Sequence, residues 1–80
     1  MDEVLIASKV KSVMSKVFGV NESEIDENSS QDTVLKWDSL GHLNLVVALE
    51  EEFSIQLSDE QVLELLNYKL VYLTVKDLVS

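Results

Sequence analysis

The sequence of 80 residues contains no cysteine, no proline, no arginine and only two glycines. Without cysteine it has neither a disulfide framework nor a cysteine-based zinc site, which fits a reducing compartment. Apolar residues nowhere continue for the ~20 positions that a transmembrane helix needs. The first residues carry acids where a signal peptide carries basic residues. We therefore expect a single domain over residues 1–80, cytoplasmic and monomeric, without a membrane span.

Basic residues are also scarce, since six lysines face fifteen acidic residues and leave a net charge of −9. Proteins that bind nucleic acid use Lys and Arg to replace the counterions of the phosphates, so this composition argues against a nucleic-acid partner. Between Trp37 and Tyr68 there are seven acidic residues and no lysine. This region predicts either an ordinary solvated face or a surface that docks partners with basic patches.

The scarcity of helix breakers, together with apolar residues at helical spacing, predicts an all-α fold. A first helix is expected over Glu3–Phe18, with Gly19 in the left-handed conformation that ends many helices. Asn21 and Glu24 have the spacing of a capping box, which predicts a short helical turn near residues 21–25.

A long first loop follows, because the residues up to Trp37 show no sustained helical period. Loops of this length are uncommon in a small domain and are usually functional or disordered. We expect this loop to be ordered, with Ile25, Val34 and Leu35 as its apolar anchors.

Three further helical segments are predicted after the loop. The segment Ser39–Phe53 has a wide apolar face, which is typical of a central, buried helix. A third helix is expected from the capping residue Ser58 to about Asn67, and a short last helix over Val75–Val79, capped by Thr74. The predicted fold is thus a small bundle of three to four helices with a long first loop.

The candidate metal and catalytic sites in the sequence lack residues that such sites require. Residues 26–37 place oxygen-bearing side chains at positions 1, 3 and 5 of a calcium-binding loop, but lack its glycine at position 6 and its glutamate at position 12. His42 is the only histidine, so a histidine metal site has no second imidazole. Asp38, Ser39 and His42 supply the residue types of a triad without an oriented base, oxyanion donors or a cleft. We predict no catalytic residue and no metal ligand.

Ser39 remains as a candidate for covalent modification. If Asp38 is the N-cap of the central helix, its carboxylate accepts a backbone N–H bond and Ser39 becomes the first helical residue with a free hydroxyl. The positive end of a helix stabilises anions. This local chemistry permits a phosphate ester on Ser39, but taken alone it favours an unmodified serine, because serine and aspartate are both common at helix starts.

The stretch Asp38-Ser39-Leu40 resembles the motif of the acyl carrier protein family, whose serine carries 4′-phosphopantetheine. Three more stretches resemble this family, at residues 18–25, 46–53 and 55–60. The resemblance implies an acyl-carrier bundle with the arm covalently bound to Ser39, beside Asp38 and Leu40. It implies a carrier without turnover of its own, loaded by a phosphopantetheinyl transferase and served by acyl-loading and acyl-processing enzymes with basic docking patches.

The resemblance and the acidic composition together suggest which residues partners contact. These candidates are Trp37, Leu40, Val46, Val47, Glu50, Glu51 and Glu52. For Trp37 the alternative is a hydrophobic staple, in which it packs with His42 over the start of the helix. Gly41 is expected to let the arm or a partner backbone come close.

The sequence departs from the family pattern just after the motif, where Gly41, His42 and Asn44 replace the acids usual in carriers of fatty acid synthesis. This departure favours a specialised freestanding carrier, serving a secondary-metabolite or surface-polysaccharide pathway. An ordinary carrier of fatty-acid or polyketide synthesis, an aminoacyl or peptidyl carrier, and an unmodified acidic interaction module remain as alternatives.

Overall fold

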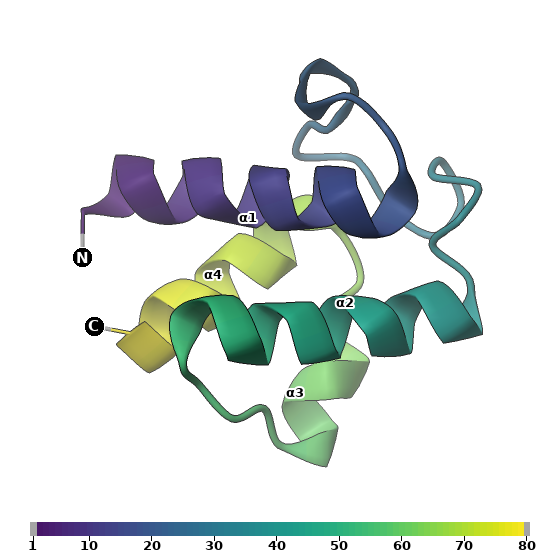
Figure 1. Ribbon diagram of the computed structural model, residues 1–80. Coiled ribbons are helices and arrows are strands. Elements are labelled where there is room, and N and C mark those ends of the chain that lie inside the picture. Colours follow the sequence, from purple (N-terminus) through teal and green to yellow (C-terminus); the bar gives the residue numbers. More distant parts are fainter. Residues whose placement is uncertain (1, 80) are drawn as a thin grey trace.

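The computed structural model describes residues 2–79, which fold into four α-helices and one short 3-10 helix (Figure 1). The elements in chain order are α1 (Glu3–Phe18), η1 (Glu22–Glu24), α2 (Ser39–Phe53), α3 (Asp59–Glu64) and α4 (Tyr68–Val79). Over these residues the fold is all-α, as predicted, and the bounds of α1 and α2 match the predicted ones.

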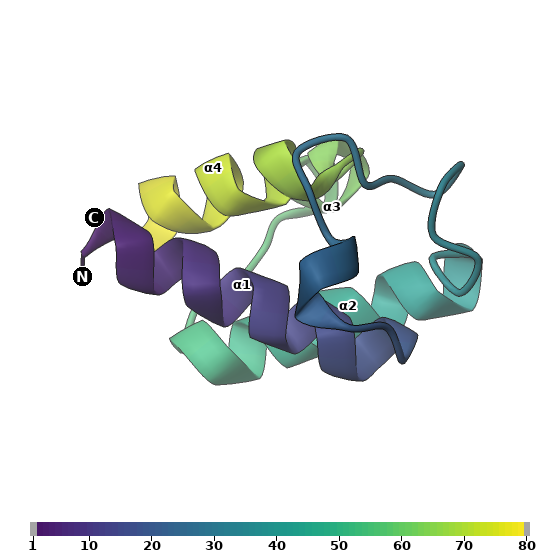
Figure 2. The same cartoon turned by 90° about the horizontal axis from the view of Figure 1, so that it is seen from above.

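The helices surround one core, in which α1 packs against both α2 and α4. Figures 1 and 2 show that α1 and α2 run in opposite directions side by side, and that the start of α1 and the end of α4 lie at the same end of the bundle. Helix α2 buries residues at every fourth position, namely Gly41, Leu45, Leu49 and Phe53. This spacing turns one stripe of α2 toward the core and leaves its opposite face in solvent.

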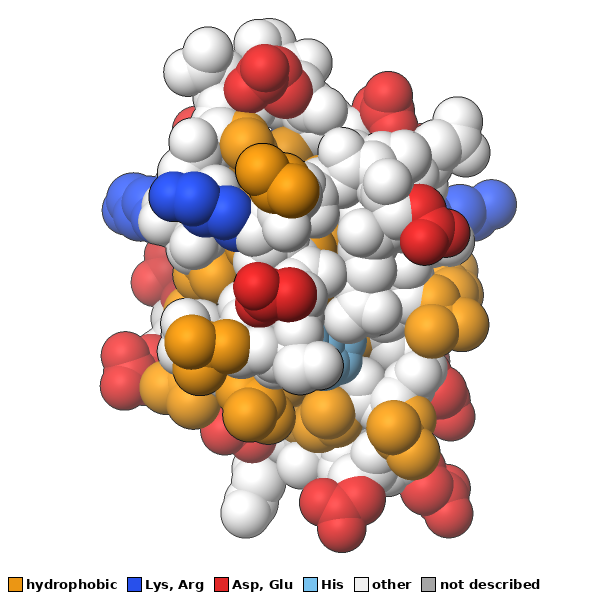
Figure 3. All heavy atoms as spheres, turned by 90° about the vertical axis from the view of Figure 1, so that its right-hand side faces the viewer, with side chains coloured by type: hydrophobic (Ala, Val, Ile, Leu, Met, Phe, Trp, Pro, Cys, Tyr) orange, Lys and Arg blue, Asp and Glu red, His pale blue; other side chains and the backbone are white. Residues whose placement is uncertain are grey.

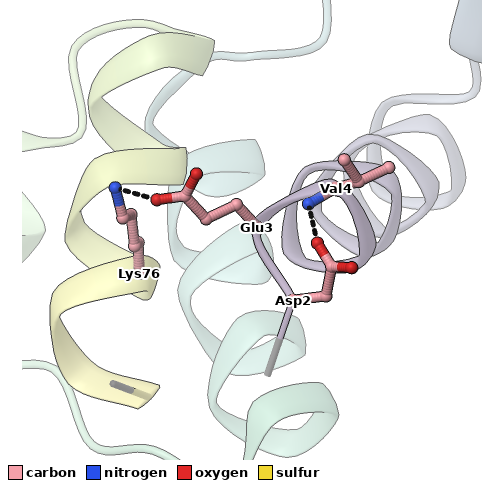
Figure 4. Close-up of polar contacts among 4 residues, drawn as sticks. All are labelled: Asp2, Glu3, Val4 and Lys76. Atoms are coloured by element: carbon pink, nitrogen blue, oxygen red, sulfur yellow. Dashed lines mark hydrogen bonds and ion pairs between the residues drawn. The ribbon is translucent and has the colours of Figure 1, made fainter.

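Helix α1 begins at a capping aspartate and ends at Gly19, the residue that was predicted to end it. Asp2 is its N-cap and accepts a hydrogen bond from the Val4 N–H at 2.8 Å, and the neighbouring Glu3 forms an ion pair with Lys76 of α4 (Figure 4). Gly19 has a φ of 67° and donates its N–H to the Ser15 carbonyl. Glycine is the usual residue at such a helix end, because it adopts the left-handed conformation without the steric cost of a Cβ atom.

The boundary between the last two helices was predicted wrongly. Helix α3 ends at Glu64 rather than Asn67, and α4 begins at Tyr68 rather than at residue 75. The cap of α4 is Asn67, whose side chain accepts a bond from the Leu70 N–H at 2.9 Å, so Thr74 lies inside the helix. The break occurs where Leu65 turns into the core, since its side chain is almost fully buried.

The long loop before α2 is held by the core and by α4. Ile25 and Val34 are buried as expected, but Leu35 is 94% exposed and anchors nothing. The predicted capping box of Asn21 and Glu24 is present at η1. In the middle of the loop, the Ser29 carbonyl accepts the Tyr68 N–H at 2.9 Å. These contacts fix the path by which the chain reaches the start of α2.

Among residues 2–79, no helix combines the length and the apolar composition required to cross a membrane.

Candidate functional site

Asp38 is the N-cap of α2, as predicted. Its Oδ1 atom accepts the Gly41 N–H at 2.8 Å, and its carbonyl accepts the His42 N–H at 2.8 Å. The carboxylate therefore satisfies one of the N–H groups that every helix leaves unpaired in its first turn.

Ser39 is the first residue of α2 and is exposed. Its hydroxyl makes no hydrogen bond to any residue from 2 to 79 because Asp38 does the capping. The helix dipole presents partial positive charge at this position, which stabilises a nearby phosphate. The geometry thus leaves one hydroxyl accessible, unengaged and in a field that favours an anionic substituent.

Trp37, directly before the cap, is 1% exposed and belongs to the hydrophobic core. Its ring stacks on Phe18 with a centroid distance of 5.1 Å, and its Nε1–H donates to His42 Nδ1 at 2.9 Å. This burial agrees with the packing alternative for Trp37, and it leaves almost no surface of the indole for a partner to contact.

His42 joins three parts of the molecule. Because an indole nitrogen can only donate, His42 Nδ1 must accept, and the ring proton of the neutral imidazole must be on Nε2. That Nε2–H is assigned as the donor to the Val62 carbonyl in α3, 2.8 Å away. The staple of Trp37 and His42 was anticipated, whereas the bond to Val62 was not, since no local spacing relates residues 42 and 62.

Replacing His42 with alanine is expected to lower the free energy of unfolding by about 1–3 kcal/mol, since it leaves the indole N–H and the Val62 carbonyl without their partner. Urea unfolding followed by circular dichroism measures this change. Asn44→Ala, at an exposed position of the same helix, is the control and should stay within about 0.5 kcal/mol. Equal stabilities of the two variants would show that the imidazole bridge contributes nothing.

Position 41 requires glycine because the loop before α2 passes close to it, which was not predicted. A Cβ atom at this position would lie 2.0 Å from the Lys36 carbonyl oxygen. The close approach that needs glycine is therefore made by the loop of the same chain. It does not require the arm or a partner backbone, as had been expected.

The three glutamates at the end of α2 have different environments. Glu50 is half-buried, and its Oε2 accepts the Leu57 N–H at 2.8 Å, which fixes the loop between α2 and α3. Glu51 and Glu52 are exposed. Of these three glutamates, only Glu51 and Glu52 thus present unengaged charge to a partner.

Replacing Glu50 with alanine is expected to lower the free energy of unfolding by about 1 kcal/mol or more, because the Leu57 N–H loses a charged acceptor. Glu51→Ala should stay within about 0.5 kcal/mol of the parent protein. Chemical denaturation compares the two variants directly. If Glu51→Ala lost more stability than Glu50→Ala, the structural role would belong to Glu51 and not to Glu50.

The other candidate residues divide by exposure. Leu40 and Val47 lie on the solvent face of α2, whereas Val46 is half-buried against the core. Three further leucines that were not predicted as contact residues are also exposed, namely Leu43, Leu63 and Leu66. For Leu43 the sequence carried a signal, because the apolar residues of α2 cover more than one stripe and cannot all face inward.

Within the described range 2–79, no three His, Cys, Asp or Glu residues cluster so as to hold a metal ion.

Comparison with the sequences of known proteins places this chain in a family. A family model described as a phosphopantetheine attachment site matches residues 8–70. An acyl carrier protein of Cyanidioschyzon merolae (strain NIES-3377 / 10D) is 42% identical to this chain over 59 residues, which are 74% of this chain and 65% of that protein. The match thus spans just under two thirds of the relative's length.

Proposed function

Because the chain belongs to the acyl carrier protein family, we propose that it carries an acyl group as a thioester on a 4′-phosphopantetheine arm attached to Ser39. The observation that supports this position is the exposed Ser39 hydroxyl, left free by the Asp38 cap at the positive end of α2. As in the family, the protein is a carrier and not an enzyme.

The residues around Ser39 suit this attachment. The Ser39 hydroxyl oxygen attacks the phosphorus next to the pantetheine of coenzyme A and forms a phosphodiester, while the pyrophosphate bond of coenzyme A breaks. The adenosine bisphosphate leaves, and the hydroxyl proton passes to a base of the transferase. The arm, once bound, supplies a thiol that can form a thioester. The first N–H groups of α2 would be close to a phosphate on Ser39 and would stabilise its charge.

Two further features support a proposal about the type of carrier and its cargo. The stretch from Ser39 to Leu49 contains no acidic residue, so the front of α2 differs from an ordinary carrier of fatty acid synthesis. This supports a specialised carrier that serves a dedicated set of loading and processing enzymes. The similarity to an acyl carrier protein favours an acyl over an aminoacyl cargo.

Loading by coenzyme A tests the proposal. We expect intact-protein mass spectrometry to show an increase of one phosphopantetheine group after incubation with coenzyme A and a broad-specificity phosphopantetheinyl transferase. If the mass stays unchanged while a control carrier is loaded in the same tube, the chain is an unmodified interaction module.

The charges of Glu51 and Glu52 are expected to speed the encounter with partner enzymes that carry basic patches. Changing both to glutamine should lower the association rate by about threefold to tenfold at low salt, and by less at high salt, where charges are screened. Stopped-flow or surface plasmon resonance measures the rate. A double variant in which Glu22 and Glu27, both exposed but outside α2, are changed to glutamine is the control. An equal loss in both double variants would show that only net charge matters.

A further inference from the structure

The imidazole of His42 links the loop that leads to Ser39 with helix α3. Its Nδ1 accepts the Trp37 indole N–H at 2.9 Å, and its Nε2 lies 2.8 Å from the Val62 carbonyl oxygen. The side chain is half-buried, and Figure 3 shows part of it, in pale blue, at the surface. Protons from the solvent can therefore reach a ring that bridges two segments distant in the sequence.

Both hydrogen bonds of His42 can form at once only while the ring is neutral. An indole nitrogen can only donate, so Nδ1 must be without a proton. A proton added to the ring goes to Nδ1, because Nε2 already carries one, and two N–H groups would then point at each other across 2.9 Å. Protonation must therefore break the bond with Trp37, whereas the bond from Nε2–H to Val62 can remain.

The orientation of the two rings offers a charged imidazole no compensation. Their planes are within 14° of each other, and their centroids are 6.3 Å apart. Since the N–H of an indole lies in the plane of its ring, a hydrogen bond between two nearly parallel rings joins their edges. A cation is attracted to the face of an aromatic ring, whereas the edge carries partial positive charge. The edge of the Trp37 indole therefore does not stabilise an imidazolium.

The charged side chains on the elements around the ring are exposed and of both signs. They are Lys36 and Asp38 before α2, Asp59, Glu60 and Glu64 on α3, Lys16 in the last turn of α1 and Lys69 near the start of α4. In residues 2–79, no carboxylate forms an ion pair with the imidazole. Exposed charges act through water and are screened by salt, so their effect is small beside that of a direct hydrogen bond.

Breaking the bond to Trp37 affects the segment that precedes Ser39. Trp37 is 1% exposed, so its N–H would be left in the core without a partner, which is costly unless the side chain moves or water enters. The neighbouring Lys36 carbonyl packs closely on Gly41, and Asp38 caps α2. A displaced indole would therefore loosen the contacts that fix the start of α2.

We propose that His42 is an acid-sensitive latch, in which the neutral imidazole fastens the loop before Ser39 to α2 and α3. Protonation releases the Trp37 side of the latch and leaves the Val62 side in place. The unfolded chain takes up the same proton without losing a bond, so it binds more protons than the folded chain and stability falls as the pH falls. The latch is a property of the chain itself and exists whether or not Ser39 carries an arm.

Spectroscopy of the whole protein can follow both partners of the latch, because the chain has one histidine and one tryptophan. The titration runs from about pH 7.5 to about pH 5.5, where an ordinary imidazole takes up its proton. As the His42 ring becomes charged, we expect the indole N–H resonance of Trp37 to leave its hydrogen-bonded position. Acrylamide should then quench the Trp37 fluorescence more strongly.

The matched variant is His42→Asn, whose carboxamide oxygen can replace Nδ1 as the acceptor but takes up no proton. Its indole resonance and quenching should stay constant over the same range. Relative to this variant, the parent protein should lose stability on acidification, by about twofold to tenfold in the unfolding equilibrium constant, which corresponds to one hydrogen bond. Urea unfolding at both pH values measures this change, and the acidic residues common to both proteins cancel. An equal pH dependence of the two stabilities would contradict the latch.

Two results in the parent protein alone would also overturn the latch, even if His42→Asn does not fold. The imidazole could take up its proton in this range without any change in the indole resonance, which would show that the bond does not depend on the charge of the ring. The ring could instead stay neutral in the folded protein at about pH 5.5, which would show that no acid switch operates in the range of an ordinary imidazole.

Discussion

Replacing Ser39 with alanine is expected to abolish attachment of the phosphopantetheine arm and leave the fold intact. The hydroxyl is the only group lost, and it makes no hydrogen bond to residues 2–79. Asp38 caps α2 without it, so the free energy of unfolding should change by less than about 0.5 kcal/mol. Intact mass after incubation with coenzyme A and transferase measures loading, and urea unfolding measures stability.

The matched control for Ser39 is Ser8→Ala, because Ser8 is another exposed helical serine. This variant should be loaded to the same extent as the parent protein. Loading of the Ser39→Ala variant would show that another residue accepts the arm. Loss of both loading and folding in that variant would instead show that Ser39 is needed for the helix start.

Replacing Gly41 with alanine is expected to destabilise the protein, although alanine normally stabilises a helix relative to glycine by about 0.5–1 kcal/mol. The added Cβ would lie 2.0 Å from the Lys36 carbonyl oxygen and 3.3 Å from Asp38 Oδ1. The backbone of Lys36 can withdraw only by moving Trp37, whose indole is buried against Phe18. We expect a loss of about 3 kcal/mol, at the upper end of the usual cost of overpacking.

Thermal or urea unfolding of Gly41→Ala measures this loss, and Asn44→Ala in the same helix controls for the change in helix propensity. The sign of the change in the free energy of unfolding is decisive, because helix propensity alone predicts that Gly41→Ala increases stability. A Gly41→Ala variant as stable as the parent protein would mean that the loop does not approach α2 as closely as described.

The parts of the fold that depend on local chemistry were predictable from the sequence. Asp38, Gly19 and the capping box at Asn21 mark helix ends through bonds within a few residues, so their spacing alone locates α1, η1 and the start of α2. The division between α3 and α4 depends instead on Tyr68, whose N–H bonds to Ser29 nearly forty residues earlier. No proline or glycine marks that break.

The site shows the same division between local and distant contacts. The capping role of Asp38 and the freedom of Ser39 follow from neighbouring residues. The reason for Gly41 is the carbonyl of a loop residue. The different roles of Glu50 and Glu51 depend on where the chain passes after α2, since Glu50 reaches Leu57. Such contacts cannot be derived from spacing, because they require the path of the loops in space.

Fragmentation of the loaded protein by tandem mass spectrometry tests the central claim most directly. The parent protein is incubated with coenzyme A and transferase, digested, and the peptide that carries phosphopantetheine is sequenced. We predict that the added group is on Ser39, at the free first position of α2. Its location on any other residue would contradict this account.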